Sequence, residues 1–74
     1  MAIVRKLERI ILERGTSHTE VNGTYSIIQD DDGMSLQIDT YGSAHRKMPD
    51  KKSQSIRFSP EAIAQLRKIL SEEL

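Results

Sequence analysis

The last sixteen residues, SPEAIAQLRKILSEEL, constrain the fold more than any other part of the chain. Ser59 is a typical N-cap, Pro60 suits the first helical position, and Glu61 places an acid in the first turn. Apolar residues recur at the spacing of one helical face: Ala62, Ile63, Leu66, Ile69 and Leu70. The sequence therefore predicts an amphipathic helix from about Pro60 to Glu73, and the preceding chain must supply the apolar surface that this helix covers.

The middle of the chain has the pattern of a β-hairpin. TYSIIQ is rich in β-branched and aromatic residues, and MSLQIDTY alternates along its length. QDDDG lies between these runs, and Gly33 can supply the positive φ that a hairpin connection needs. QSIRF predicts a further short strand that ends at Phe58, directly before the helix. In the second run, one face has Met34, Leu36, Ile38 and Thr40, and the other has Ser35, Gln37, Asp39 and Tyr41.

Two structures fit the N-terminal residues 3–14. The periodicity of the apolar residues favours a helix, and Gly15 would then terminate it. The residues of this apolar stripe are Ile3, Val4, Leu7, Ile10 and Ile11. Alternatively, the residues from Leu7 to Arg14 form a strand, with a turn at residues 15–18 leading into the hairpin. The fold class is α+β in both cases. The strand gives an antiparallel four-stranded sheet followed by the C-terminal helix (ββββα), and the helix gives αβββα.

The size and composition of the chain predict one small cytoplasmic domain over residues 1–74. A domain this small buries only about 60% of the surface that its unfolded chain exposes, so it often gains stability as a homodimer. The chain contains no Cys, so a disulfide or a thiolate metal site is excluded. The N-terminal stretch does not resemble a signal peptide, and no apolar run approaches the roughly 20 residues that span a bilayer. We therefore expect no contact with a membrane.

Charge is distributed unevenly although the net charge is zero. Residues 15–40 have a net charge of −5, whereas residues 41–58 have a net charge of +4. Four of the eleven Lys and Arg residues lie in YGSAHRKMPDKK, the segment from Tyr41 to Lys52 between two predicted strands. The local field, more than net charge, attracts a charged partner to a surface.

Residue patterns typical of enzymes and metal sites are missing from the sequence. His18 and His45 are not at metal-ligand spacing, and the run Asp30–Asp32 lacks the spaced ligands and closing Glu of an EF-hand. Ser43 and His45 are close in sequence, but no third group at a recognisable spacing orients them. The four Gly residues form no phosphate-binding motif. We therefore expect a protein that is not an enzyme and that uses neither metal nor cofactor.

The basic segment predicts a nucleic-acid contact. Several cations close together can neutralise phosphates and release condensed counterions, and the rings of Tyr25 and Tyr41 can stack on unpaired bases. The expected binding residues are Tyr41, His45, Arg46, Lys47, Lys51, Lys52 and Arg57. The alternative is a small accessory or inhibitor protein that binds another protein through the same charge asymmetry. A run of charges can also be a solvated surface with no partner.

Residues 36–70 resemble a known family. LQIDTYGSAHRKM resembles the strand and basic loop of this family, and SIRFSPEAIAQLRKIL resembles its last strand and helix. The family is that of positive-cofactor-four-type transcriptional coactivators and their small bacterial relatives. The resemblance implies a homodimer of four antiparallel strands and one helix, with a strand at the N-terminus and a sheet that binds single-stranded DNA. It places Tyr41 at the stacking aromatic, and Lys47 beside Arg46 at the loop cations. Asp39 stands where the family usually has a basic residue.

Overall fold

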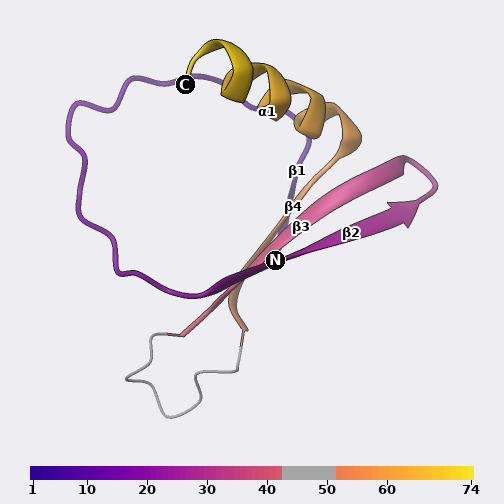
Figure 1. The fold of residues 1–74 in the computed structure, drawn as a ribbon, viewed down its shortest axis with the longest axis horizontal. Helices are drawn as coiled ribbons and strands as arrows, with labels where there is room; N and C mark the ends of the chain where they lie inside the picture. Colours follow the sequence, from indigo (N-terminus) through magenta and orange to yellow (C-terminus); the bar gives the residue numbers. More distant parts are fainter. Residues whose placement is uncertain (43–51) are drawn as a thin grey trace.

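A computed structural model describes residues 1–42 and 52–74 (Figure 1). Four strands precede one helix. The predicted α+β class, with a four-stranded sheet and a C-terminal helix, is confirmed. The elements are β1 (Ala2–Val4), β2 (Gly23–Asp30), β3 (Gly33–Tyr41), β4 (Lys52–Phe58) and α1 (Pro60–Glu72).

The sheet has the strand order β1-β4-β3-β2, and it is mixed. The central strand β3 is antiparallel to both neighbours, with Leu36 opposite Ile27 on β2 and opposite Phe58 on β4. The strand β1 is parallel to β4, with Val4 also opposite Phe58. The prediction of a wholly antiparallel sheet is therefore wrong, because β1 joins the sheet beside the last strand and does not pair with β2.

The N-terminal segment also differs from both structures that the sequence predicts. Only Ala2–Val4 forms a strand, and residues 5–22 contain neither the predicted long strand nor the alternative helix. The Ser59 N–H donates to the Val4 carbonyl at 3.0 Å, and the chain then runs beside α1 (Figure 1). There the Gln65 side chain accepts from the Leu7 N–H at 2.8 Å and donates to the Leu7 carbonyl at 3.2 Å. This amide satisfies backbone groups that a neighbouring strand would otherwise bind.

The hairpin connection forms as predicted. Pairing of β2 with β3 continues to Asp30 opposite Gly33, which leaves Asp31 and Asp32 as a two-residue loop. Gly33 has φ of +117°, a conformation that glycine adopts at little steric expense. The Asp32 N–H donates to Asp30 Oδ1 at 2.9 Å, so an aspartate side chain stabilises the turn.

The helix α1 covers one face of the sheet in part. Its first turn is capped, because the Ala62 N–H donates to Ser59 Oγ at 3.2 Å, and Ala62 is fully buried. A groove of about 500 Å³ separates α1 from the hairpin, and its apolar lining includes Ile27, Met34, Leu36, Ile63, Leu66 and Leu70. The predicted division of β3 into two faces is correct. The face with Gln37 and Tyr41 points away from α1.

Candidate nucleic-acid interface

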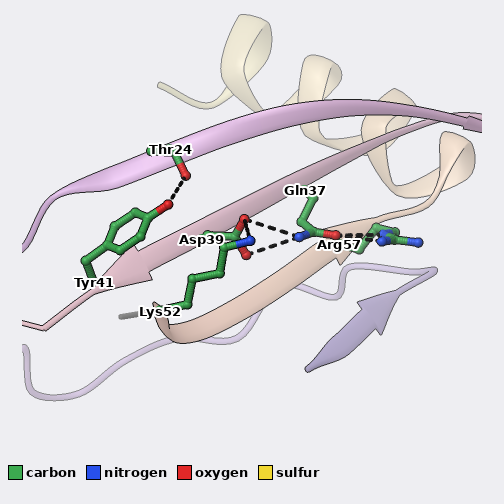
Figure 2. A network of polar contacts seen from close by, with 6 residues as sticks. All are labelled: Thr24, Gln37, Asp39, Tyr41, Lys52 and Arg57. Atoms are coloured by element: carbon green, nitrogen blue, oxygen red, sulfur yellow. Dashed lines mark hydrogen bonds and ion pairs between the residues drawn. The ribbon is translucent and has the colours of Figure 1, made fainter. Parts of the chain in front are cut away.

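A row of polar side chains follows β3 and β4 on the face of the sheet opposite α1 (Figure 2). The antiparallel register places Gln37 opposite Arg57, and Asp39 opposite Ser55. Tyr41 is opposite Lys52, next to an irregularity in the register between Thr40 and Tyr41. Alternation along β3 and pairing with β4 together gather these side chains on one surface.

Asp39 is the buried centre of this row, with 2% of its surface exposed. Gln37 Nε2 donates to both carboxylate oxygens at 3.1 and 3.2 Å, and Lys52 Nζ lies 3.3 Å from Oδ2. Hydrogen bonds from Ser55, then from Gln37 and Lys52, lower the pKa of Asp39 below its ordinary value of 3.8, although burial opposes this shift. The carboxylate is therefore ionised and paired at neutral pH.

The paired state of Asp39 matters for the character of the surface. An unpaired acid at this position would repel phosphate. Lys52 instead lies beside the carboxylate, and its own side chain is 58% exposed. Lys52 therefore compensates the Asp39 charge within the protein. Lys52 is one of the cations that the sequence predicts to bind the ligand.

Arg57 keeps its positive charge. Its Nε and Nη2 atoms donate to Gln37 Oε1 at 3.1 and 2.6 Å. Because Gln37 is neutral, these bonds orient the guanidinium without neutralising it. Arg57 forms no ion pair within residues 1–42 and 52–74. A half-buried guanidinium held in this way presents a flat cationic group at a fixed place on the sheet.

Tyr41 lies at the other end of the row. Its hydroxyl is 3.0 Å from Thr24 Oγ1 on β2, and its N–H donates to the Asn22 carbonyl at 3.1 Å. The ring is half-buried and lies on the face opposite α1, where the Thr24 contact limits its orientation (Figure 2). A ring held in one orientation loses little entropy when a flat partner stacks on it.

The structure brings together three of the predicted contact residues: Tyr41, Lys52 and Arg57. His45, Arg46, Lys47 and Lys51 lie outside the described residues. Tyr25 is on the opposite face, because it pairs with Ile38. No role for Gln37 or Ser55 followed from the sequence. Alternation placed Gln37 on this face, but the contacts of these two residues with Arg57 and Asp39 depend on the register between β3 and β4.

Other classes of site find no support in the described part of the chain. No group of three or more His, Cys, Asp or Glu side chains could hold a metal ion there. None of its helices is long and apolar enough to cross a membrane. No protein-family model, curated protein or solved structure matches the chain.

Proposed function

We propose that this protein binds single-stranded nucleic acid through the polar face of its sheet, without catalysing a reaction. The supporting observation is the row that contains Tyr41, Lys52 and Arg57 on the face that α1 leaves uncovered. In sequence, Tyr41 and Lys52 are joined by a segment with three further cations: Arg46, Lys47 and Lys51. This combination of an aromatic ring with several cations suits unpaired bases on a charged backbone.

Each side chain has a distinct part in the proposed contact. The Tyr41 ring stacks on a base, and Arg57 offers a guanidinium plane or a phosphate contact. The cations between Tyr41 and Lys52 in the sequence neutralise phosphates and displace counterions, and His45 is a further expected contact. Asp39 does not repel the phosphates of the nucleic acid, because Lys52 compensates the charge of its carboxylate.

A salt titration tests the proposal. Binding of an oligo-dT strand, followed by fluorescence anisotropy, should weaken linearly with salt concentration on logarithmic axes. Tyr41→Ala should weaken binding by about 1–3 kcal/mol, the range for loss of one stacked base. Tyr41→Phe is the matched control, since it keeps the ring and removes only the hydroxyl. Weak binding that does not respond to salt, or equal losses in both variants, would contradict the proposal.

The contribution of Arg57 can be measured against a second arginine. Arg57→Ala should lower affinity and reduce the salt slope by about one if it contacts a phosphate. Arg67→Ala removes the same charge from α1, beside the groove on the opposite face, and should leave the slope unchanged. Equal slopes for the two variants would place the ligand elsewhere.

A protein-binding accessory or inhibitor role is the alternative, and the apolar groove between α1 and the hairpin favours it. Such a groove suits an apolar segment of another protein. Under this alternative, a protein captured from nuclease-treated lysate should be lost with Leu70→Asp and retained with Tyr41→Ala. Capture that is lost with Tyr41→Ala and that nuclease treatment abolishes favours nucleic acid instead.

The proposal also includes a homodimer. Ala62 is the one apolar residue that is buried in the described part of the chain, so a single copy has a small core. A second copy would stabilise such a protein by covering apolar surface.

A further inference from the structure

The strand β2 forms an edge of the sheet that lacks the usual protection against pairing. Edge strands commonly have Pro, Lys or a bulge that prevents another strand from adding. The sequence GTYSIIQD contains no Pro and no Lys, and its single charge is Asp30 at the end. Its register with β3 is continuous from Gly23 to Asp30. The outer side of β2 is therefore a regular template eight residues long.

The outward-facing backbone groups of β2 can be identified. Bonded and non-bonded pairs alternate in an antiparallel ladder. Because the Tyr41 N–H donates to the Asn22 carbonyl, Thr24, Ser26 and Ile28 bond inward to β3. The alternate residues, including Tyr25 and Ile27, direct their N–H and C=O groups outward. Within residues 1–42 and 52–74, no other strand and no backbone hydrogen bond occupies this outer side.

The apolar side chains of Tyr25 and Ile27 on this edge are also largely exposed. Tyr25 is 74% exposed and Ile27 is 57% exposed, and both lie on the face that α1 covers in part. Aromatic and β-branched residues that lie directly opposite each other stabilise antiparallel strand pairs. A partner strand with a β-branched residue opposite Tyr25 would gain this contact. If the partner is β2 of a second copy, its Ile27 can lie opposite Tyr25, and its Tyr25 opposite Ile27, so the contact forms twice.

The repeated contact between Tyr25 and Ile27 selects a second copy as the occupant, and the surface area of the chain is large enough to allow it. The accessible surface is 6726 Å², whereas a compact monomer of 8.4 kDa exposes about 4,600 Å². The excess of about 2,100 Å² is more than twice the roughly 800 Å² that each partner buries in a stable interface. The area that one copy would bury in a dimer is therefore smaller than the excess accessible surface of this chain.

We propose that β2 pairs antiparallel with β2 of a second copy, centred on Ser26, around a two-fold axis perpendicular to the sheet. The register places Tyr25 opposite Ile27 of the second copy, and the reverse, and joins the two sheets into one. Both polar faces then lie on the same side of the joined sheet, since the axis does not exchange the faces. This inference specifies the homodimer of the proposed function, and it does not require nucleic acid.

The first test is the molar mass in solution without nucleic acid. Light scattering should give twice 8.4 kDa for the wild type. Ile27→Lys, which places a charge on the edge, should give 8.4 kDa. Ile10→Lys is the matched control, because Ile10 is 73% exposed and lies outside the sheet, and it should remain a dimer. A monomeric wild type, or an Ile27→Lys dimer, overturns the inference.

The second test fixes the register with engineered thiols, since the chain has no Cys. The two Ser26 residues would form a non-hydrogen-bonded pair with Cα atoms about 4.5 Å apart, which a disulfide can bridge. Ser26→Cys should therefore crosslink the dimer on oxidation. Thr24→Cys should not, because the two Thr24 residues would lie about 13 Å apart along the strands.

The outcomes of these tests separate the two proposals. Crosslinking of Thr24→Cys as fast as Ser26→Cys overturns the register, even if Ile27→Lys unfolds or dissociates the protein. An 8.4 kDa wild type that still binds oligo-dT with a strong salt dependence overturns the dimer alone. A crosslinked Ser26→Cys dimer that does not bind oligo-dT overturns nucleic-acid binding alone.

Discussion

The two faces of the sheet differ in how completely their groups are satisfied. On the polar face, Ser35 and Asp39 are each 2% exposed, and every buried side-chain polar atom in the described residues has a hydrogen-bond partner. On the apolar side, Ile27 and Met34 of the sheet and Leu70 of α1 remain about half exposed. Hydrogen bonds and an ion pair therefore order the first face within one copy, whereas burial on the second face is incomplete. The apolar face has the unsatisfied surface that a protein partner would cover.

The largest expected effect is on the covered part of the apolar face. Leu36→Ala should lower the free energy of unfolding by about 2 kcal/mol, at the low end for such a truncation because Leu36 is only half-buried. Urea denaturation measures the change. Met34→Ala is the control on the same strand and face, and since Met34 is 48% exposed, its effect should be less than half as large. Equal effects would mean that α1 does not protect one position more than the other.

The start of α1 should show the next largest effect. Ser59→Ala removes the oxygen that accepts the Ala62 N–H, and such a loss destabilises a protein by about 1 kcal/mol. Ser71→Ala is a suitable control, since the Ser71 hydroxyl donates to the Lys68 carbonyl on an exposed part of the helix. Thermal unfolding of the two variants should differ clearly. No difference would indicate that the cap does not contribute to the docking of α1.

The polar face should show its contribution through pH. The pKa of Asp39 is lower in the folded protein than its ordinary value of 3.8, so the unfolded chain binds the proton more tightly. The stabilisation is complete above pH 3.8 and is lost as pH falls through the lower, folded-state pKa. Asp39→Asn keeps the shape and removes the titration.

The measurement is the difference in unfolding free energy between the wild type and Asp39→Asn across an acid series. Glu61 also has a lowered pKa, because its own N–H and the Ser59 side chain donate hydrogen bonds to it, and this contribution cancels in the difference. The wild-type advantage should decline as pH falls below 3.8. A difference that is independent of pH in that range would contradict the assigned contacts of Asp39.

The smallest expected effect is at the end of α1. Arg9 Nη1 lies 2.8 Å from Glu73 Oε1, and both side chains are substantially exposed. Exposed pairs of this kind contribute about 0.2–1 kcal/mol, and salt screens them. Arg9→Ala should therefore change the free energy of unfolding by less than Ser59→Ala, and the change should decrease further in high salt. An effect as large as that of Leu36→Ala would show that the segment beside α1 is part of the core.

Local patterns in the sequence were sufficient to predict the helix and the hairpin. Ser59 and Pro60 mark the start of α1, and alternation from Met34 to Tyr41 assigns the faces of β3. The place of β1 could not be predicted, because nothing in the three residues Ala2–Val4 specifies parallel pairing with β4 at the far end of the chain. The contact between Gln65 and Leu7, which are 58 positions apart, is equally non-local.

The candidate site was predictable to a similar extent. Alternation along β3 predicted that Gln37, Asp39 and Tyr41 share one face. The cations follow shortly after these residues in the sequence. The compensation of Asp39 by Lys52 depends on the register between β3 and β4, which a single sequence does not reveal. The Thr24 contact that positions Tyr41 likewise depends on the pairing of β2 with β3.

The central claim is that the polar face, and not the apolar face, contacts single-stranded nucleic acid. Amide and side-chain NMR shifts recorded during titration with an oligo-dT strand test it most directly. The expected result is a continuous set of shifts at Gln37, Tyr41 and Arg57 that disappears at high salt. Shifts confined to the groove residues Met34, Leu66 and Leu70, or no shifts at all, would contradict the claim.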